Sequence, residues 1–482
     1  MSKLILLPFE GSEPRSEGSY PLPPSRKWVT FVGQLVMGRR SREKALSASE
    51  TARGTASLQN HWRITRLQAT MLPRLLSFEY LVLTRDYDRF FMPYDFDSKI
   101  DRRSAGSAKW SYYPQDVIPM WVADMDFKSA EPITQALTER IAHGVFGYEL
   151  PSTSLQQTII GWLKAHYAWE VQPDDLVFLP GLVSGLNLSC RAFGHIGDAA
   201  LMVTPVYPPF LSAPENNGMT ARKVQLTRAD DNGHVRYVID FDALEKAITP
   251  RTRMLIHCHP HNPIGQEFTP DDMRRLGELC LKHNLVQCSD EIHCDLMLGG
   301  AKHTPAATLS PDIAEHTVTL MAPSKTFNIP GLGFSFAIVT NKRLRQQLTN
   351  AEAGIIPHIN ALGLTAAQAA YTEGEGWLTA LLDYLTVNRD TMLDFIAENM
   401  PGVKAAVPAA TYLGWFDCAS VDISGNPYQF FLKEAKVAVN DGAMFGPGGE
   451  GFVRFNFGCP RLQMIEALTR MADALHKKAG AH

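Results

Sequence analysis

The sequence predicts an α/β protein in which a large, mostly parallel sheet is accompanied by a smaller α+β domain. Between about residues 155 and 345, short apolar runs alternate with helical segments, a pattern typical of a parallel sheet covered on both faces. The chain has 482 residues, too many for one ordinary hydrophobic core. We therefore expect a small domain formed by residues 92–145 and 375–482, and a large domain formed by residues 146–374.

Residues 1–91 differ in composition from the rest of the chain. They contain 14 Lys and Arg and 8 Asp and Glu, a balance of 14 − 8 = +6, which leaves −4 − 6 = −10 for the remainder. A disordered arm, a small accessory domain and sequence upstream of the true start all remain open. We favour an extension that is dispensable for catalysis, and a basic arm that binds nucleic acid is the functional rival.

The predicted elements follow from Met92 onward. An extended apolar stretch spans residues 118–127, and Thr269-Pro270-Asp271-Asp272 has the composition of a helix N-cap and first turn. Strands are predicted at Leu176–Leu179, Ala199–Thr204, Lys223–Leu226, Met254–Cys258, Val286–Ser289, Thr317–Met321 and Phe334–Val339. Helices are predicted at Pro132–His143, Leu155–Tyr167, after Gly185, after Thr269, at Trp377–Met400 and at the C-terminal end.

The overall composition limits the classes of function. Hydrophobic residues make up 45% of the chain and charged residues 20%, which indicates a soluble globular protein. The net charge of −4 offers no general attraction to nucleic acid or anionic membranes. The seven cysteines are scattered without a CxxC pair, so we expect free thiols in a reducing cytoplasm and no metal site. Met1–Pro8 is too short in its apolar part for a signal peptide, and no run approaches the roughly 18 apolar residues of a membrane span.

Three polar residues each follow the carboxyl end of a predicted strand: Asn262, Asp290 and Lys325. In open α/β sheets, ligands bind outside the carboxyl ends of the strands, so these side chains should converge on one crevice. A single lysine is most often a solvated surface charge. Together with the other two residues, however, Lys325 is predicted to form a Schiff base with pyridoxal phosphate.

The same cofactor needs further partners. Asp290 would face its ring nitrogen and Asn262 would donate to its ring oxygen, although the first could be a strand-end acid and the second part of a β-turn. Gly181-Leu182-Val183-Ser184-Gly185 precedes a predicted helix, and its backbone N–H groups could bind the phosphate. Glycines before helices are common, so this last signal is weak by itself.

Four motifs carry a resemblance to a known family. They are Trp121-Val122-Ala123-Asp124-Met125-Asp126-Phe127, His261-Asn262-Pro263-Ile264-Gly265, Ser289-Asp290-Glu291-Ile292-His293 and Ser324-Lys325-Thr326-Phe327-Asn328. In type and order they closely resemble fold-type I pyridoxal-phosphate enzymes, and more narrowly the MalY/PatB-type cystathionine β-lyases (C–S lyases) of the class I/II aminotransferase superfamily. The resemblance runs from about Met92 to the C-terminus and does not include residues 1–91.

The resemblance implies roles for residues that the sequence pattern does not single out. Tyr207 would stack on the cofactor ring, the backbone of Val183 and Ser184 would contact the phosphate, and Ala123 would lie at the substrate. Tyr148 would reach the phosphate of a neighbouring subunit, which implies a homodimer with shared active sites.

The substrate α-carboxylate also needs a partner. Arg454 would bind it through the guanidinium fork. Arg461 is the rival for this role, but it lies beyond the predicted strand and after Pro460. No second arginine for a dicarboxylate substrate is evident, which counts mildly against an aspartate-type aminotransferase.

This sequence departs from the usual superfamily pattern at three positions. Ala322 replaces a hydroxyl residue, and Gly333 lies where many relatives have an arginine near the phosphate, so Ser324 and backbone groups would do more of the binding. His293 replaces a tyrosine, and it could either bond near the ring oxygen or be a buried core residue.

The resemblance implies α,β-elimination of L-cystathionine or a related cysteine S-conjugate to a thiol, pyruvate and ammonia. An aminotransferase of class I/II is the alternative, because both reactions begin with loss of the same Cα proton. A more remote alternative is a regulator that combines the pyridoxal-phosphate fold with a DNA-binding arm.

Overall fold

The computed structural model describes residues 94–423 and 425–480. The predicted N-terminal extension, residues 1–91, lies outside the described residues, as does the hypothesis of a nucleic-acid-binding arm. No helix in the described part of the chain is both long and apolar enough to cross a membrane.

The largest sheet has seven strands in the order β2-β10-β9-β8-β7-β3-β4. The strands are β2 (Leu176–Leu179), β3 (Ala199–Thr204), β4 (Thr220–Gln225), β7 (Thr252–Cys258), β8 (Val286–Asp290), β9 (Thr317–Met321) and β10 (Ser335–Ile338). Neighbouring strands from β9 to β4 pair in parallel, whereas β10 is antiparallel to both β2 and β9. The prediction of a mostly parallel sheet is confirmed, with β10 as the exception.

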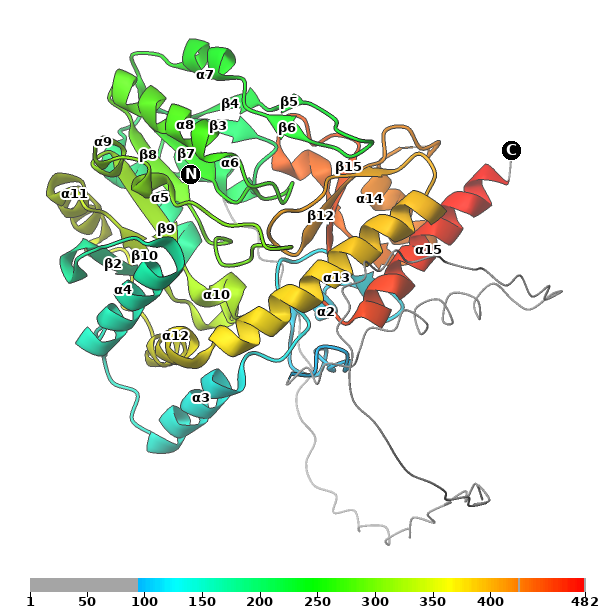
Figure 1. Cartoon of the computed structure of the whole chain (residues 1–482), viewed down its shortest axis with the longest axis horizontal. Helices are drawn as coiled ribbons and strands as arrows, with labels where there is room; N and C mark the ends of the chain where they lie inside the picture. Colours follow the sequence, from blue (N-terminus) through cyan, green and yellow to red (C-terminus); the bar gives the residue numbers. More distant parts are fainter. Residues whose placement is uncertain (1–93, 424, 481–482) are drawn as a thin grey trace, which may run out of the picture. The chain divides into compact units, whose positions relative to one another are not determined.

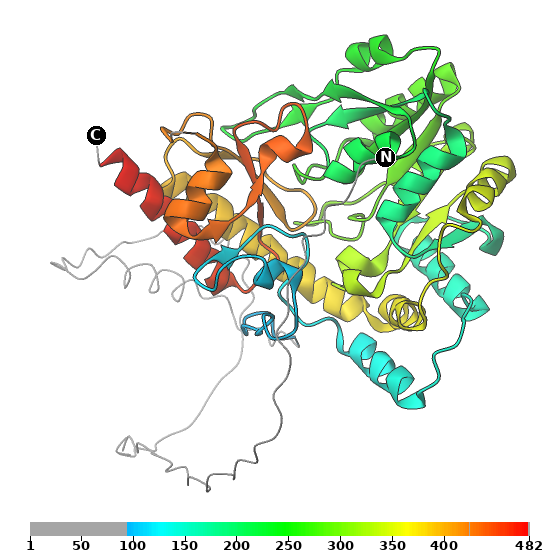
Figure 2. The ribbon, with the colours of Figure 1, turned by 180° about the vertical axis from the view of Figure 1, so that it is seen from behind.

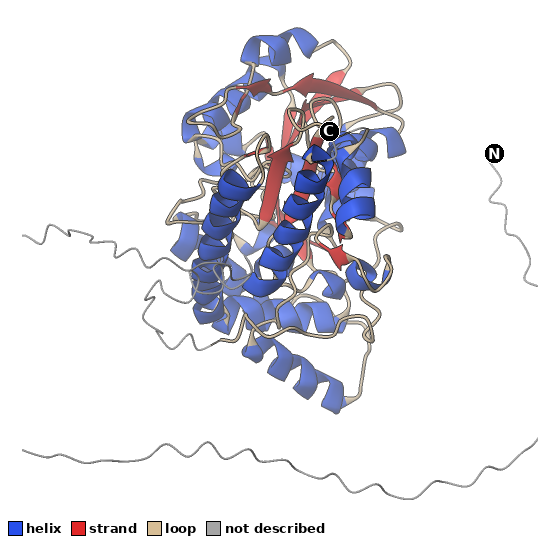
Figure 3. Cartoon of the chain, turned by 90° about the vertical axis from the view of Figure 1, so that its right-hand side faces the viewer, coloured by secondary structure: helices blue, strands red, loops and turns tan. Residues whose placement is uncertain are grey.

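The predicted helices correspond to α3, α4, α5, α8, α13 and α15; α5 begins before Gly185, at Leu182, and the others begin close to the predicted positions. The α-helices are α2 (Ala108–Ser111), α3 (Glu131–His143), α4 (Thr153–Tyr167), α5 (Leu182–Phe193), α6 (Pro208–Asn216), α7 (Phe241–Ala247), α8 (Pro270–His283), α9 (Pro311–Ala314), α10 (Pro323–Thr326), α11 (Lys342–Glu352), α12 (Ala361–Glu373), α13 (Glu375–Asn399), α14 (Pro427–Phe430) and α15 (Arg461–Ala479). Shorter helical turns are η1 (Pro173–Asp175), η2 (Ala306–Thr308), η3 (Pro330–Leu332), η4 (Phe431–Ala435) and η5 (Gly442–Phe445). Figure 3 shows helices on both sides of the strands.

The start of α8 follows the predicted capping pattern. The Thr269 hydroxyl accepts a hydrogen bond from the Asp272 N–H, and the Asp272 carboxylate accepts one from the Thr269 N–H. This capping box satisfies two backbone donors that lack partners within the helix. The helix ends at His283, and the next residue, Asn284, adopts the left-handed conformation common at helix C-termini.

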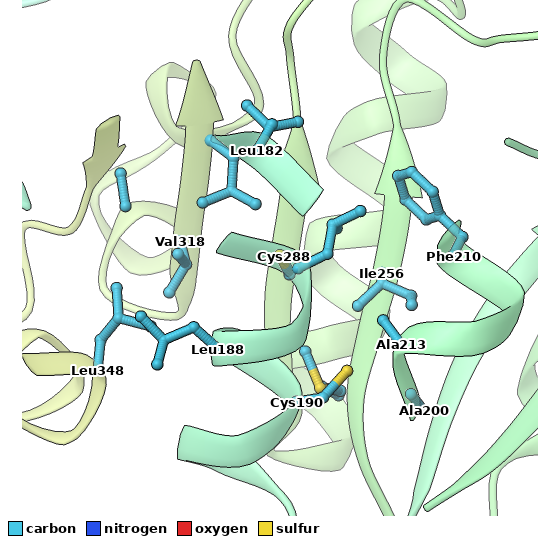
Figure 4. Close-up of a cluster of buried hydrophobic side chains, with 14 of the residues drawn as sticks. Leu182, Leu188, Cys190, Ala200, Phe210, Ala213, Ile256, Cys288, Val318 and Leu348 are labelled. Atoms are coloured by element: carbon cyan, nitrogen blue, oxygen red, sulfur yellow. The ribbon is translucent and has the colours of Figure 1, made fainter. Parts of the chain in front are cut away.

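The helix α5 packs one apolar face onto the centre of the large sheet. Figure 4 shows side chains of α5 and α6 beside those of β7, β8 and β9. Gly185 lies on the buried face of α5, where a Cβ atom would come within 3.2 Å of both the Leu179 and the Leu320 side chains. The glycine therefore permits a close approach that places the N-terminus of α5 near the strand ends. The opposite face of the sheet packs against residues of α8, among them Met273, Leu276 and Cys280.

A second sheet is formed by the C-terminal part of the chain. Its strands, in the order β11-β12-β15-β14, are β11 (Lys404–Ala405), β12 (Leu413–Asp417), β15 (Phe452–Asn456) and β14 (Asn440–Asp441). All three pairings are antiparallel. The long helix α13 packs against α15 and contacts β11 (Figure 1).

Two short strand pairs complete the secondary structure: β5 (Thr227–Arg228) with β6 (Tyr237–Val238), and β1 (Ile118–Pro119) with β13 (Val437–Ala438). The parallel pair β1–β13 joins the first described segment to the C-terminal part of the chain, and Figure 2 shows these two regions side by side. The exact boundaries of the two predicted domains stay a prediction.

Two elements differ from expectation. Strand β4 spans Thr220–Gln225 instead of Lys223–Leu226, because it is an edge strand with partly exposed polar residues and lacks a clear apolar run. Lys325 follows a strand, as the sequence predicts, but it lies in the single-turn helix α10, which begins with Pro323 and has no counterpart among the predicted helices.

Candidate active site

A cavity of about 230 Å³ opens at the carboxyl ends of the central strands. Nine of the predicted site residues line it: Ala123, Val183, Ser184, Tyr207, Asn262, Asp290, His293, Ser324 and Lys325. Because the parallel strands β7, β8 and β9 end at the same edge, the segments that follow them bring Asn262, Asp290 and Lys325 together. The convergence expected from the sequence is present in the structure.

Lys325 is held at the cavity by the polypeptide backbone. Its Nζ donates a hydrogen bond of 2.6 Å to the carbonyl oxygen of Ala123. Burial disfavours the charged ammonium and lowers the pKa of Lys325 to about 8, a shift that the nearby Asp124 carboxylate opposes. A lysine with this pKa can exchange a proton near neutral pH.

Asp290 is the last residue of β8 and is 1% exposed. Its Oδ1 accepts a hydrogen bond of 3.1 Å from the Ile292 backbone N–H. Burial raises the pKa of this carboxyl group to about 7 despite that hydrogen bond. A cationic ligand group placed beside Asp290 would compensate for the lost hydration and favour the carboxylate.

Asn262 is oriented by an arginine from the second sheet. Its Oδ1 accepts a hydrogen bond of 3.0 Å from Nη1 of Arg454, and its backbone oxygen accepts one of 3.1 Å from the Tyr207 N–H. With Oδ1 committed to Arg454, the amide nitrogen is the Asn262 group left to donate to a ligand oxygen in the cavity.

Arg454 on β15 is hydrogen-bonded to residues of three separate segments of the chain. In addition to Asn262, it donates through Nη2 to the Trp121 carbonyl oxygen at 3.0 Å and to Asn440 Oδ1 at 2.7 Å. Its Nε is buried and has no hydrogen-bond partner among the described residues. Burial lowers the pKa of Arg454 to about 10, so the side chain remains a cation at neutral pH.

The rival arginine lies elsewhere. Arg461 begins α15, and its Nε donates to Asn388 Oδ1 at 3.0 Å. Its guanidinium stacks over the Tyr384 ring, 4.6 Å from the centroid. Neither Arg454 nor Arg461 is among the residues that line the cavity. Arg454 is bonded directly to Asn262, which does line it, and its binding of the carboxylate stays a prediction.

His293 lines the cavity as a neutral side chain. Burial, together with the positive charges of Lys325 and Arg454, lowers the pKa of His293 to about 3. Its Nδ1 is buried without a hydrogen-bond partner among the described residues. Such an atom is unusual in a folded protein and is available to a ligand.

One end of the cavity offers groups suited to a phosphate. Val183 and Ser184 lie in the first turn of α5, whose N-cap residue, Gly181, has no side chain to cap it. The backbone N–H groups of a first turn lack partners within the helix and attract anions. Ser324 also lines the cavity and adds a hydroxyl group.

Ala322 and Gly333, which depart from the usual superfamily pattern near the phosphate, both lie in surroundings that suit a small residue. Ala322 is 3% exposed and belongs to the hydrophobic core beneath the site. Gly333 has a φ of +60°, and a Cβ atom there would lie 3.0 Å from the Pro180 carbonyl oxygen. An arginine at this position would therefore strain the backbone.

The segment that carries Ala123 is fixed by two residues, Tyr412 and Asn328, to which the sequence analysis gave no role in the site. The Tyr412 hydroxyl donates to the Ala123 carbonyl oxygen at 2.9 Å, the same oxygen that accepts from Lys325. The Asn328 side chain bonds the Met125 N–H and carbonyl and the Phe127 carbonyl, each at 2.9 Å. Asn328 belongs to a motif quoted from the sequence, whereas nothing near Tyr412 in the sequence marks it.

Tyr148 lies outside the cavity of its own chain. It is 97% exposed, in the extended segment between α3 and α4, with its ring 6.1 Å from that of His358. Its predicted contact with a second subunit is not tested by a single chain.

The comparisons with known proteins agree with the geometry of the site. Residues 115–471 match the family described as aminotransferase class I and II. The chain is 40% identical over 389 residues to the cystathionine β-lyase PatB of Bacillus subtilis, a match that covers 79% of this chain and 100% of PatB.

Solved structures also resemble the chain. Cystalysin from Treponema denticola, which contains a pyridoxal 5′-phosphate cofactor, is 32% identical with a TM-score of 0.76, covering 80% of this chain and 99% of cystalysin. The PLP-bound C–S lyase from Staphylococcus hominis is 34% identical with a TM-score of 0.74, covering 79% of this chain and 98% of that lyase.

Proposed function

The chain belongs to the aminotransferase class I and II family, and we propose that it is a pyridoxal-phosphate-dependent carbon–sulfur β-lyase. One observation carries this conclusion: the similarity to proteins named cystathionine β-lyase and C–S lyase spans nearly their whole length. The proposed substrate is L-cystathionine or a related cysteine S-conjugate.

The residues that line the cavity fit pyridoxal phosphate. The buried carboxyl of Asp290, with its raised pKa, is suited to a protonated ring nitrogen, and Asn262 is suited to the ring oxygen. The first turn of α5 is suited to the phosphate, and Tyr207 to stacking on the ring. His293 Nδ1, buried without a partner in the described residues, is suited to a hydrogen bond near the ring oxygen.

The residues of the chain have separate tasks in the proposed elimination. When bound, pyridoxal phosphate supplies an electron sink for the substrate α-carbon. Arg454 binds and orients the α-carboxylate, and Lys325 takes the Cα proton on Nζ. The Cβ–S bond then breaks, the sulfur leaves as a thiol after taking up a proton, and water converts the remaining three-carbon unit to pyruvate and ammonia.

The Ala123 carbonyl oxygen fixes the position of the base. It accepts hydrogen bonds from both Lys325 Nζ and the Tyr412 hydroxyl, and Asn328 ties the residues that follow Ala123 to the segment carrying Lys325. The amine therefore keeps its place while its proton is exchanged, which general base catalysis requires.

The proposal is tested by incubating the purified chain and pyridoxal phosphate with L-cystathionine in the absence of any 2-oxo acid. A lyase releases pyruvate, ammonia and a thiol in equal amounts. An aminotransferase shares the loss of the Cα proton but needs a 2-oxo acid to turn over, so a strict requirement for that acceptor would refute the lyase assignment.

We also propose that two copies of the chain form a homodimer in which Tyr148 reaches the partner's site. The segment between α3 and α4 exposes several apolar side chains: Val145 by 62%, Phe146 by 56% and Leu150 by 75%. Adjacent exposed apolar residues mark surfaces that bind another protein.

Mixing inactive variants tests the shared site. Lys325→Ala and Tyr148→Phe chains, each poorly active alone, are dissociated together and allowed to reassociate. A hybrid dimer contains one site with both native residues, so activity should reappear on mixing. Activity that stays at the level of the separate variants would contradict the shared site.

A cytoplasmic location is part of the same proposal. All seven cysteines are buried free thiols, a state that a reducing compartment maintains. Two domains with the predicted boundaries and an N-terminal extension dispensable for catalysis are also proposed. A chain that begins at Met92 should retain lyase activity, and its loss would contradict the dispensable extension.

A further inference from the structure

Four side chains with metal-binding groups lie together near the ends of β7 and β8. His259 follows β7, Glu267 precedes α8, Glu291 follows β8, and His303 lies in the segment between β8 and α9. Both histidines and Glu291 are less than 9% exposed. None of the four lines the cavity described above, and the proposed lyase reaction uses none of them.

The spacing of three of these groups suits one metal ion. Glu267 Oε1 lies 3.0 Å from His303 Nδ1 and 3.1 Å from His259 Nε2, and one ligand atom from each residue lies within 4.8 Å of the others. Zinc bonds of 2.0–2.2 Å in a tetrahedron place ligand atoms about 3.3 Å apart. Two of the distances are thus within about 0.3 Å of this value, and small shifts of the side chains would bring all three groups to a zinc ion.

The hydrogen bonding within the cluster is incomplete. Both ring nitrogens of His259 and the Oε2 atom of Glu267 are buried without a hydrogen-bond partner among the described residues. His259 is 0% exposed, and although its Nε2 is close to Glu267 Oε1, the two atoms are not aligned as a hydrogen bond. Folded proteins rarely leave buried polar atoms unpaired, and a bound cation would engage them.

The surroundings of His303 are those of a metal ligand. Its Nε2 is 2.9 Å from Glu291 Oε2, while Glu291 Oε1 accepts hydrogen bonds from the Ser289 hydroxyl at 2.6 Å and the Ala306 N–H at 3.0 Å. A carboxylate that holds the second nitrogen of a ligating histidine fixes the ring orientation and increases its basicity.

Each nitrogen of His303 lies beside a carboxylate oxygen: Nδ1 is 3.0 Å from Glu267 Oε1 and Nε2 is 2.9 Å from Glu291 Oε2. A Zn²⁺ ion bound at Nδ1 would take the place of a proton there, which passes to solvent, while Nε2 stays bonded to Glu291.

We propose that His259, Glu267 and His303 bind one Zn²⁺ ion, with Glu291 orienting His303. Nitrogen and carboxylate ligands in this number suit zinc. Three protein ligands leave the fourth tetrahedral position to water. The metal would join the segment that carries Asn262, between His259 and Glu267, to the segment that begins with Asp290 and Glu291. It would thus hold two of the residues expected to contact the cofactor.

The direct test is the zinc content of the full-length chain without a histidine tag. The wild type, the variants His259→Ser and Glu267→Gln, and the control His283→Gln are each equilibrated with zinc sulfate, dialysed and analysed by mass spectrometry. His283 pairs with Glu245 at 2.9 Å on the surface and is the matched histidine–carboxylate control. Circular dichroism confirms that each variant is folded.

We expect about one zinc per chain in the wild type and in His283→Gln, as a single site of three protein ligands requires. In His259→Ser and Glu267→Gln the affinity should fall by at least about 10- to 100-fold, the loss seen on removing even an outer partner of a ligand. A wild-type chain that retains no zinc, or ligand variants that retain as much as the control, would overturn the proposal.

Thermal unfolding provides a readout that does not depend on catalysis. A strong chelator should lower the melting temperature of the wild type and of His283→Gln, and should leave that of His259→Ser unchanged. The His259 side chain makes no hydrogen bond to another described residue, and the backbone hydrogen bond from its N–H to Asp290 is kept in His259→Ser, so the replacement removes no hydrogen bond. An equal chelator effect on wild type and His259→Ser would place the metal elsewhere and reject this site.

Discussion

Replacing Arg454 with lysine tests the predicted recognition of the substrate carboxylate. The guanidinium bonds Asn262, Trp121 and Asn440 simultaneously and leaves a buried Nε without a partner in the described residues. A lysine ammonium keeps the charge but cannot reproduce this planar arrangement of donors. Arg454→Lys should therefore lose the bidentate contact with the carboxylate while remaining a cation.

The size of the effect follows from the hydrogen bonds that are lost. A hydrogen bond to a charged group contributes about 1.5–3 kcal/mol, and about 1.4 kcal/mol corresponds to a factor of ten in rate. We expect kcat/KM for pyruvate release from L-cystathionine to fall by about 10- to 150-fold, mainly through KM. An S-alkyl cysteamine, which has no α-carboxylate, should inhibit the variant and the wild type equally.

Arg461→Lys is the matched control, because Arg461 bonds Asn388 and stacks on Tyr384 outside the cavity. It should change kcat/KM little. The assignment is wrong if Arg461→Lys raises KM while Arg454→Lys does not, or if the cysteamine analogue binds the Arg454 variant as poorly as the substrate does.

Two further predictions concern stability. The pKa of Asp290 is raised from 3.8 to about 7 by burial, so between these pH values the folded, cofactor-free chain binds more protons than the unfolded chain and becomes less stable as pH rises. At about 1.4 kcal/mol per pKa unit, the free energy of unfolding should fall by a few kcal/mol over this range. In urea unfolding experiments between pH 4 and 7, Asp290→Asn should show a smaller fall than the wild type. An unchanged pH dependence in the variant would contradict the role of Asp290. Asn328→Ala removes three hydrogen bonds to Met125 and Phe127 and should destabilise the chain by about 2–4 kcal/mol. The exposed Asn350→Ala serves as control, and equal midpoints of urea unfolding for the two variants would argue against the role of Asn328.

The fold could be predicted from the sequence where burial is uniform. Strands β3 and β9 are buried along their whole length and were predicted with their observed bounds, because both consist of apolar residues and threonine. The antiparallel direction of β10 was not predicted, since an apolar run does not record strand direction. The helix α10 was missed because four residues are too few to show helical periodicity.

In the site, too, the residues marked by local sequence patterns could be predicted, whereas contacts between residues far apart in the sequence could not. Asn262, Asp290 and Lys325 could be predicted because each lies at or just beyond the end of a strand, a position that the sequence pattern reveals. The hydrogen bond from Tyr412 to Ala123 joins residues 289 positions apart, and only the folded chain reveals such a contact. For the same reason, no local spacing of cysteines or histidines in the sequence marks the cluster around His303.

Lys325→Ala is the most direct test of the central claim, that Lys325 holds the cofactor and acts as the base. The purified variant is loaded with pyridoxal phosphate, dialysed free of amino acids and compared with wild type and with the variant of an exposed lysine, Lys342→Ala. Lys325→Ala should lose both the visible absorbance of the bound cofactor and turnover of L-cystathionine, the latter by about 10²- to 10⁴-fold or more. Wild-type absorbance or wild-type turnover persisting in Lys325→Ala would contradict this claim.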